Sequence, residues 1–169
     1  QTADEFANGS TPLTLSLQGG SDGSAPSDAD LIRAYDYLKS AEDVDVSLIM
    51  LGSHGSTVIR HVIGNIAESR KDCVAFFSPE RADVVNVTSS STATDNVVDH
   101  RDTVNMNTSY AVMDSGWKRG FDKHNDKFRY MPLNGDVAGL CARTDTDRDP
   151  FFSPAGFTRG QIKGVVNLP

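Results

Sequence analysis

The stretch LGSHGST, residues 51–57, is where side chains suited to nucleophilic chemistry first gather. A serine hydroxyl becomes a nucleophile when a histidine accepts its proton. Ser53 and His54 are neighbours in the chain, so their side chains point apart, and the stretch lacks the G-x-S-x-G spacing of a nucleophile elbow. The chain also contains no G-x-x-x-x-G-K-[ST] phosphate loop. We therefore interpret residues 52–56 as a strand-to-helix turn and expect no enzyme active site.

The same turn supports an alternative function. It follows an apolar run and precedes a helical pattern, which is where α/β folds bind ligands. A small-ligand or nucleotide-binding α/β domain would use residues 52–56. It would have a deep pocket lined by Ser53, His54 and Ser56.

Metal-ligand spacing is missing among the histidines. No pair shows H-x-x-x-H or H-E-x-x-H spacing, and no cysteine lies close to one in sequence; the four are His54, His61, His100 and His124. The run DTDRD at 145–149 resembles the start of a calcium loop. An EF-hand requires Gly at its sixth position and Glu at its twelfth, where this chain has Pro150 and Gly156. We expect a solvated helix end there, and no metal or cofactor.

Composition sets the class of the protein. With 169 residues, 38% hydrophobic and 23% charged, the chain is typical of one globular domain, and no apolar run approaches the length of a membrane span. The net charge of -7 argues against a nucleic-acid binder, which would present a basic face. The aromatic and basic run WKRGFDKHNDKFRY, residues 117–130, is therefore predicted to be a β-hairpin with an aromatic inner face and a charged outer face.

Cys73 and Cys141 lie far apart in apolar surroundings, and we expect reduced thiols. A secreted adhesion module is the remaining alternative. It would carry glycans at Asn86 or Asn107, which begin Asn-x-Ser/Thr motifs, and it would place the two cysteines in a disulfide.

The first half of the chain reads as a strand–helix–strand unit. Residues 1–27 are a Gly/Ser-rich segment with one possible strand, LTLSLQ at 13–18, and Ser27 is suited to cap a helix at 28–41. A β-rich run follows at 44–51, whose continuously apolar second half predicts a strand covered on both faces. Apolar residues at helical spacing from Val58 to Ile66 predict a helix, and CVAFFSP at 73–79 predicts a second buried strand.

The second half continues the alternation. We expect a short loop or helix after Ala82, a helix near 92–103, and strands in 109–114 and 127–133. Asn134 or Asp136 is predicted to cap a helix that buries Val137, Leu140 and Cys141, and residues 160–168 are predicted to hold the last strand. The fold class is therefore α/β, a three-layer domain over 28–169 with a mixed, partly parallel sheet flanked by helices.

The run SPAGFTRGQIKGV, residues 153–165, has no catalytic pattern but predicts a stiff turn. Pro154 fixes one backbone angle and Gly156 permits a conformation closed to other residues. At least one of the nearby Phe151, Phe152 and Phe157 is expected to pack into the core and anchor the turn. The candidate interface or turn residues are Ser153, Pro154, Gly156, Arg159 and Lys163.

Several motifs in fixed order resemble one family. LQGGSDG, DVDVSLIMLGSHG, RKDCVAFFSP, DKFRYMPLNGDVAGLCARTD and SPAGFTRGQIKGV are similar to the signatures of the core domain of contractile phage (myovirus) tail sheath proteins. The motifs cover residues 13–168. Residues 82–108 depart most from the family, and no role is carried over to them.

The resemblance implies a structural protein without catalysis or cofactor. Sheath subunits of the family polymerise helically around a tail tube and contract to drive the tube through the host envelope during genome delivery. They contact neighbouring subunits, the tube protein, and baseplate and tail terminator proteins, with no nucleic acid and no membrane insertion. The implied location is the virion tail, after synthesis in the host cytoplasm. The chain is then the inner domain of a longer subunit, and Arg159 and Lys163 would meet acidic groups on a neighbour.

Overall fold

The computed structural model describes residues 16, 19–21, 23–157 and 159–166. Its helices are α2 (Asp28–Asp36), α3 (Ser56–Val62), the π-helix η1 (Ile63–Ala67), α4 (Glu68–Arg70), α5 (Arg81–Val84), α6 (Ser90–Val104) and α7 (Asn134–Asp147). Its strands are β1 (Leu48–Met50), β2 (Val74–Phe77), β3 (Ala111–Met113), β4 (Trp117–Asp122), β5 (Lys127–Pro132) and β6 (Val165–Val166). The strand predicted at 13–18 falls outside the described residues, apart from Ser16.

A parallel sheet of order β1-β2-β3 forms the centre of the fold. Leu48 pairs with Val74 and Ala75 with Ala111, so the predicted strand–helix–strand unit is confirmed. The central strand β2 is covered on both faces, as expected. The same expectation for β1 is wrong, because β1 is an edge strand and Met50 is 55% exposed.

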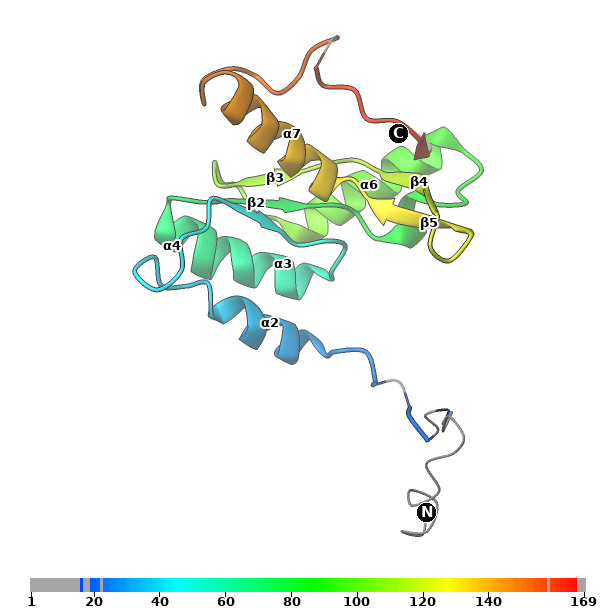
Figure 1. Cartoon of the computed structure of the whole chain (residues 1–169), viewed down its shortest axis with the longest axis horizontal. Coiled ribbons are helices and arrows are strands. Elements are labelled where there is room, and N and C mark those ends of the chain that lie inside the picture. The colour runs from blue at the N-terminus through cyan, green and yellow to red at the C-terminus, as the bar shows by residue number, and fades with distance from the viewer. Residues whose placement is uncertain (1–15, 17–18, 22, 158, 167–169) are drawn as a thin grey trace, which may run out of the picture.

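Helices cover both faces of this sheet, which confirms the α/β, three-layer architecture (Figure 1). Helix α7 lies on one face, and α3 with η1 and α6 on the other, with α2 outside α3. The apolar residues at helical spacing are completely buried; they are Val58, Ile59, Val62, Ile63 and Ile66. Their stripe is the main contact between the helical layer and the sheet, and the periodicity predicted it.

Helix α2 begins where the sequence predicts. Ser27 is the N-cap, its side chain accepts from the Asp30 amide, and the Asp30 carboxylate accepts in return from Ser27. The helix ends at Asp36, earlier than the predicted residue 41. Beyond it the chain turns, and the Ser40 hydroxyl accepts from the Asp43 amide 3.3 Å away. A serine that satisfies nearby backbone groups in this way favours a turn over a helix.

The remaining strands form a second sheet, which is antiparallel and has the order β5-β4-β6. The hairpin β4–β5 is confirmed, but its predicted inner aromatic face is wrong, since Phe121 and Phe128 are 55% and 56% exposed. Only Trp117, at the base, is buried, where its indole N–H donates to the Pro79 carbonyl at 3.0 Å. The predicted last strand is confirmed at β6, which pairs with β4.

Helix α7 differs from its prediction at its start. Neither predicted residue is the N-cap: Leu133 holds that position, and Asn134 is the first helical residue. Its buried positions are Asn134, Ala138 and Thr144, whereas the expected Val137, Leu140 and Cys141 are only half-buried. The predicted helix near 92–103 is confirmed as α6, and both cysteines are free thiols.

Candidate functional site

The turn at 52–56 directs its polar groups into the protein. Gly52 has φ +68°, and its carbonyl accepts hydrogen bonds from Asn134 Nδ2 at 2.7 Å and from the Ser78 amide at 3.2 Å. The His54 ring meets the Tyr35 ring edge to face, with centroids 6.4 Å apart. These contacts are structural: the Gly52 carbonyl is used by donors of the protein itself, and the His54 ring packs on an aromatic neighbour.

A polar network closes the sheet at the carboxyl ends of its strands. The Ser78 hydroxyl follows β2; it donates to Asp114 Oδ2 after β3 at 2.6 Å and accepts from Asn134 Nδ2 at 3.0 Å. Ser78 and Asn134 are buried. Burial raises the pKa of Asp114, against the opposing effect of its hydrogen bonds from Ser78 and the Gly116 amide.

This network argues against the alternative of a ligand site at 52–56. The place where α/β folds receive a ligand is filled by the protein's own side chains. The hollow beside the turn is lined by Ser56 with residues of α5 and α6, and not by Ser53 or His54. Sequence reasoning missed this network, because it joins residues far apart in the chain.

Neither a metal-binding cluster nor a membrane-spanning helix is found in the described part of the chain. No three His, Cys, Asp or Glu side chains there gather closely enough to hold a metal ion. None of the helices described is long and apolar enough to cross a bilayer.

The predicted turn in 153–160 is present and is held by hydrogen bonds. The Ser153 carbonyl accepts from Arg159 Nε at 2.9 Å, and the Ser153 hydroxyl accepts from the Ala155 amide at 3.2 Å. The Gly160 amide donates to the Gly156 carbonyl at 2.9 Å. Gly156 has φ +151°, a conformation that other residues rarely adopt.

The expected aromatic anchor of this turn is wrong. Phe151 is 81% exposed, Phe152 39% and Phe157 99%, and the first two stack on each other with centroids 4.8 Å apart. The turn is held instead by Arg159 and by Arg143 of α7, whose guanidinium donates to the Arg159 carbonyl. Three large apolar side chains therefore face solvent at one end of the molecule.

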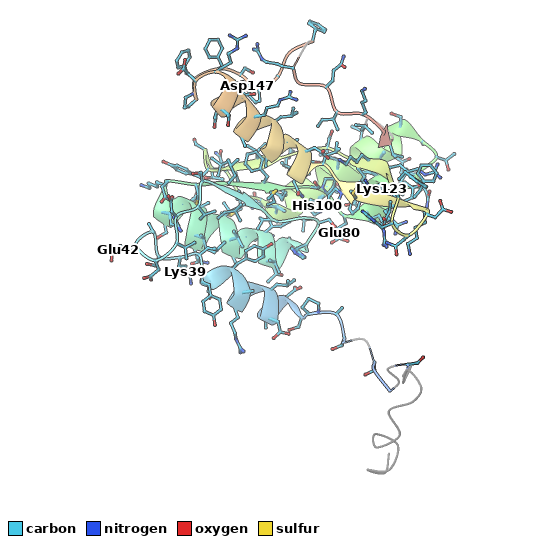
Figure 2. The ribbon with its side chains drawn as sticks, viewed as in Figure 1. Lys39, Glu42, Glu80, His100, Lys123 and Asp147 are labelled. Carbon is cyan, nitrogen blue, oxygen red and sulfur yellow. The ribbon has the colours of Figure 1, made fainter. Side chains whose placement is uncertain are left out.

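Arginines gather between the end of α7 and the C-terminal segment. A hollow of about 530 Å3 there is lined by Arg143, Thr144, Asp147, Arg148 and Arg159. Figure 2 labels Asp147 at the end of α7. Lys163 lines a second hollow of about 400 Å3, together with the ion pair of Lys118 and Asp136 (2.6 Å). Arg143 lines both hollows, so the structure adds Arg143 and Arg148 to the predicted Arg159 and places Arg143 between Arg159 and Lys163.

Two further glycines constrain the C-terminal segment strongly. Gly164 has φ +77°, and a Cβ there would lie 2.9 Å from the Arg119 carbonyl oxygen of β4. A Cβ on Gly160 would lie 3.0 Å from the Pro154 carbonyl oxygen. Both glycines permit close backbone approach, which seats the segment against the hairpin and closes the turn.

Comparison with known proteins identifies the family. The family model of the phage tail sheath protein central domain matches residues 26–169. The chain belongs to the phage tail sheath family. Tail sheath proteins of Vibrio phage KVP40 and Enterobacteria phage T4 are 40% and 38% identical to this sheath chain over 89% and 99% of its length. The tail sheath protein of Salmonella phage ViI is 30% identical over 96%.

The segment spans about a quarter of the length of these sheath relatives. The match includes the turn at 153–160, the arginine hollow and the residues 82–108, to which the motifs assigned no role. The exposed phenylalanines and arginines therefore belong to a sheath central domain.

Proposed function

We propose that this chain is part of the structural subunit of a contractile phage tail sheath. The subunit polymerises helically around the tail tube and contracts to drive the tube through the host envelope during genome delivery. The family match over residues 26–169 carries this proposal. The subunit is not an enzyme: contraction draws on free energy stored in the packing of the extended assembly.

The partners follow from this role. The subunit associates with neighbouring sheath subunits and with the tube, and the ends of the sheath meet baseplate and tail terminator proteins. Residues 28–169 form the inner domain of a longer subunit and 1–27 precede it. The protein is made in the host cytoplasm and is located in the tail of the virion.

The C-terminal turn supports an assembly role for this domain. A contiguous apolar surface that faces solvent in a monomer commonly marks a contact site. The stacked rings of Phe151 and Phe152 provide such a surface, and Arg159 of the same segment supplies the charge that selects the register of a partner. We assign the turn and Lys163 to contact with acidic groups on a neighbouring subunit.

Electron microscopy of the full-length subunit tests this function. Tubes or rings of uniform diameter are expected, and a subunit that forms neither would refute the sheath role. The double variant Arg159→Glu, Lys163→Glu is expected to block assembly or contraction. The control Arg33→Glu, Lys39→Glu makes the same charge change on α2 and in the turn that follows it, and is expected to assemble normally. Normal assembly and contraction by the first variant would refute the contact at the turn.

A further inference from the structure

The hairpin β4–β5 carries an excess of basic residues, although the chain as a whole is acidic. Residues 117–132 contain five Lys or Arg and two Asp, whereas the whole chain has a net charge of -7. Arg129 pairs with Asp122 at 2.6 Å and Lys118 pairs with Asp136. Lys123 and Lys127, at the tip, are exposed and form no ion pair in the part of the chain that the structure describes. Their charge is available to a partner.

An exposed aromatic pair lies beside these lysines. The rings of Phe121 and Phe128, which face each other across the hairpin, are 5.2 Å apart in an edge-to-face arrangement, and both are more than half exposed. The Arg119 guanidinium lies 4.1 Å from the Phe128 ring centroid. The Trp117 indole fixes the base of the hairpin, and the Asp122 carboxylate, which accepts from the amides of His124 and Asn125 and from Arg129, orders its tip. A preformed, ordered surface costs little conformational entropy when it binds.

An acidic cleft of about 330 Å3 lies on α5, α6 and the start of α3. It is lined by Ser56, Glu80, Asp83, Asn96, Asp99, His100 and Thr103. Glu80 and Asp99 are exposed and take part in no ion pair among the described residues. The cleft thus has unpaired carboxylates and no Lys or Arg in its wall.

A buried histidine gives a second sign that the cleft is incomplete in the isolated chain. His100 is only 9% exposed, and its Nε2 has no hydrogen-bond partner among the residues that the structure describes. Its Nδ1 lies 3.8 Å from Asp83 Oδ2. Buried polar atoms are nearly always paired in native structures, so an unpaired one in the wall of a cleft points to a missing partner. Figure 2 shows His100 and Glu80 on elements other than the hairpin that carries Lys123.

We propose that the hairpin tip of one copy docks on the acidic cleft of a second copy. Lys123 and Lys127 of the tip then face Glu80 and Asp99 of the cleft, and the aromatic pair beside the lysines is covered by its rim. The charges identify a second copy of this chain as the partner, because the basic tip and the acidic cleft are complementary and both belong to this chain.

The geometry of such a contact suits a growing assembly. The two surfaces differ, so a tip that fills a neighbour's cleft leaves one tip and one cleft unused at the ends of the pair. A heterologous contact of this kind continues into a ring or a helical filament. The proposal rests on the sheath function and adds to it a contact separate from the C-terminal turn.

Zero-length carbodiimide cross-linking of assembled full-length sheath tests the contact. Tubes are assembled from equal parts of light and 15N-labelled subunits, so that a cross-link between a light and a heavy peptide joins two chains. Mixed-isotope links from Lys123 or Lys127 to Glu80, Asp83 or Asp99 are expected. If tubes form but these links are absent or fall only within one chain, the proposal is wrong while the sheath function stands. If no tubes form, both fail.

Charge exchange provides a second test. Lys123→Glu with Lys127→Glu, and separately Glu80→Lys with Asp99→Lys, are each expected to lower the fraction of subunit recovered as tubes by about tenfold or more, since like charges then face each other. An equal mixture of the two variants is expected to restore assembly, because the acidic tip of the first variant then meets the basic cleft of the second. The α2 control, Arg33→Glu with Lys39→Glu, is expected to assemble normally.

Two results would overturn the proposal in this test. One is normal assembly by either variant alone. The other concerns binding of a single-stranded oligonucleotide. If the native chain binds it and the Lys123→Glu, Lys127→Glu variant does not, the tip is a nucleic-acid contact.

Discussion

Replacing Asn134 by alanine tests whether the polar network at the strand ends holds α7 to the sheet. The change removes the Nδ2 group that donates to the Gly52 carbonyl at 2.7 Å and to the Ser78 hydroxyl at 3.0 Å. The backbone bond from the Asn134 amide to the Ser78 hydroxyl, 3.1 Å, remains. The two lost bonds contribute about 1 kcal/mol each, and a small cavity adds to the cost. The free energy of unfolding should fall by about 2 to 3 kcal/mol.

Thermal unfolding followed by circular dichroism measures the effect. For a domain of this size the loss corresponds to a fall in Tm of about 4 to 12 °C. Asn65→Ala is the matched control, because Asn65 is exposed and hydrogen-bonds only to His61 of the preceding turn. Its Tm should change by no more than about 1 °C, since such surface changes cost less than about 0.5 kcal/mol.

Asn134→Asp separates hydrogen bonding from shape. The introduced carboxylate keeps the side-chain volume but has no hydrogen to donate, and it lies near Asp114 through their shared partner Ser78. Burial raises its pKa in the folded state, so the lost stability is recovered as the pH falls below that raised pKa. A Tm unchanged in Asn134→Ala, or a variant with aspartate as stable as the native chain at neutral pH, would refute the role given to the network.

The remaining predictions concern the isolated chain. At micromolar concentration light scattering should show a monomer, and stable rings would contradict this. Gly156→Val should lower the free energy of unfolding by about 1 to 3 kcal/mol. Gly164→Val should lower it by at least as much, because the new Cβ would also meet the Arg119 carbonyl. Urea titration measures both variants, and an unchanged midpoint would exclude backbone strain. Arg129 and Asn125 lower the pKa of Asp122 from 3.8 to about 2. This contribution to stability is therefore present above about pH 4 and is lost as the pH falls toward 2. Arg129→Leu should raise the titration midpoint of Asp122 measured by NMR, and an unchanged midpoint would show that Arg129 is not the cause.

Local patterns predicted the parallel half of the fold well. The helix was predicted from the spacing of the apolar residues from Val58 to Ile66, and the strand from the apolar run at 73–79; both patterns are properties of the chain itself. The Ser27 cap is also local, since it is complete within four residues. For these elements the tertiary structure and the local preference agree, which is why the sequence alone was enough.

The errors arose where coverage by distant elements decides the outcome. Alternation in the hairpin puts Phe121 and Phe128 on one face, but only the rest of the fold determines whether that face is covered. Asparagine is common at N-caps, yet Asn134 lies inside the helix because its amide satisfies the distant Gly52 carbonyl. Arg143 was not connected to Arg159, because the contact depends on how the chain folds back after α7.

The Ser78–Asp114–Asn134 network has a mechanical consequence. It fastens the ends of two strands and the first turn of α7 at one place, so a load applied to α7 passes into the sheet without a hinge between them. The C-terminal segment, by contrast, is joined to the second sheet by the two-residue strand β6. The α/β layers would therefore move as one rigid body in a rearrangement of subunits.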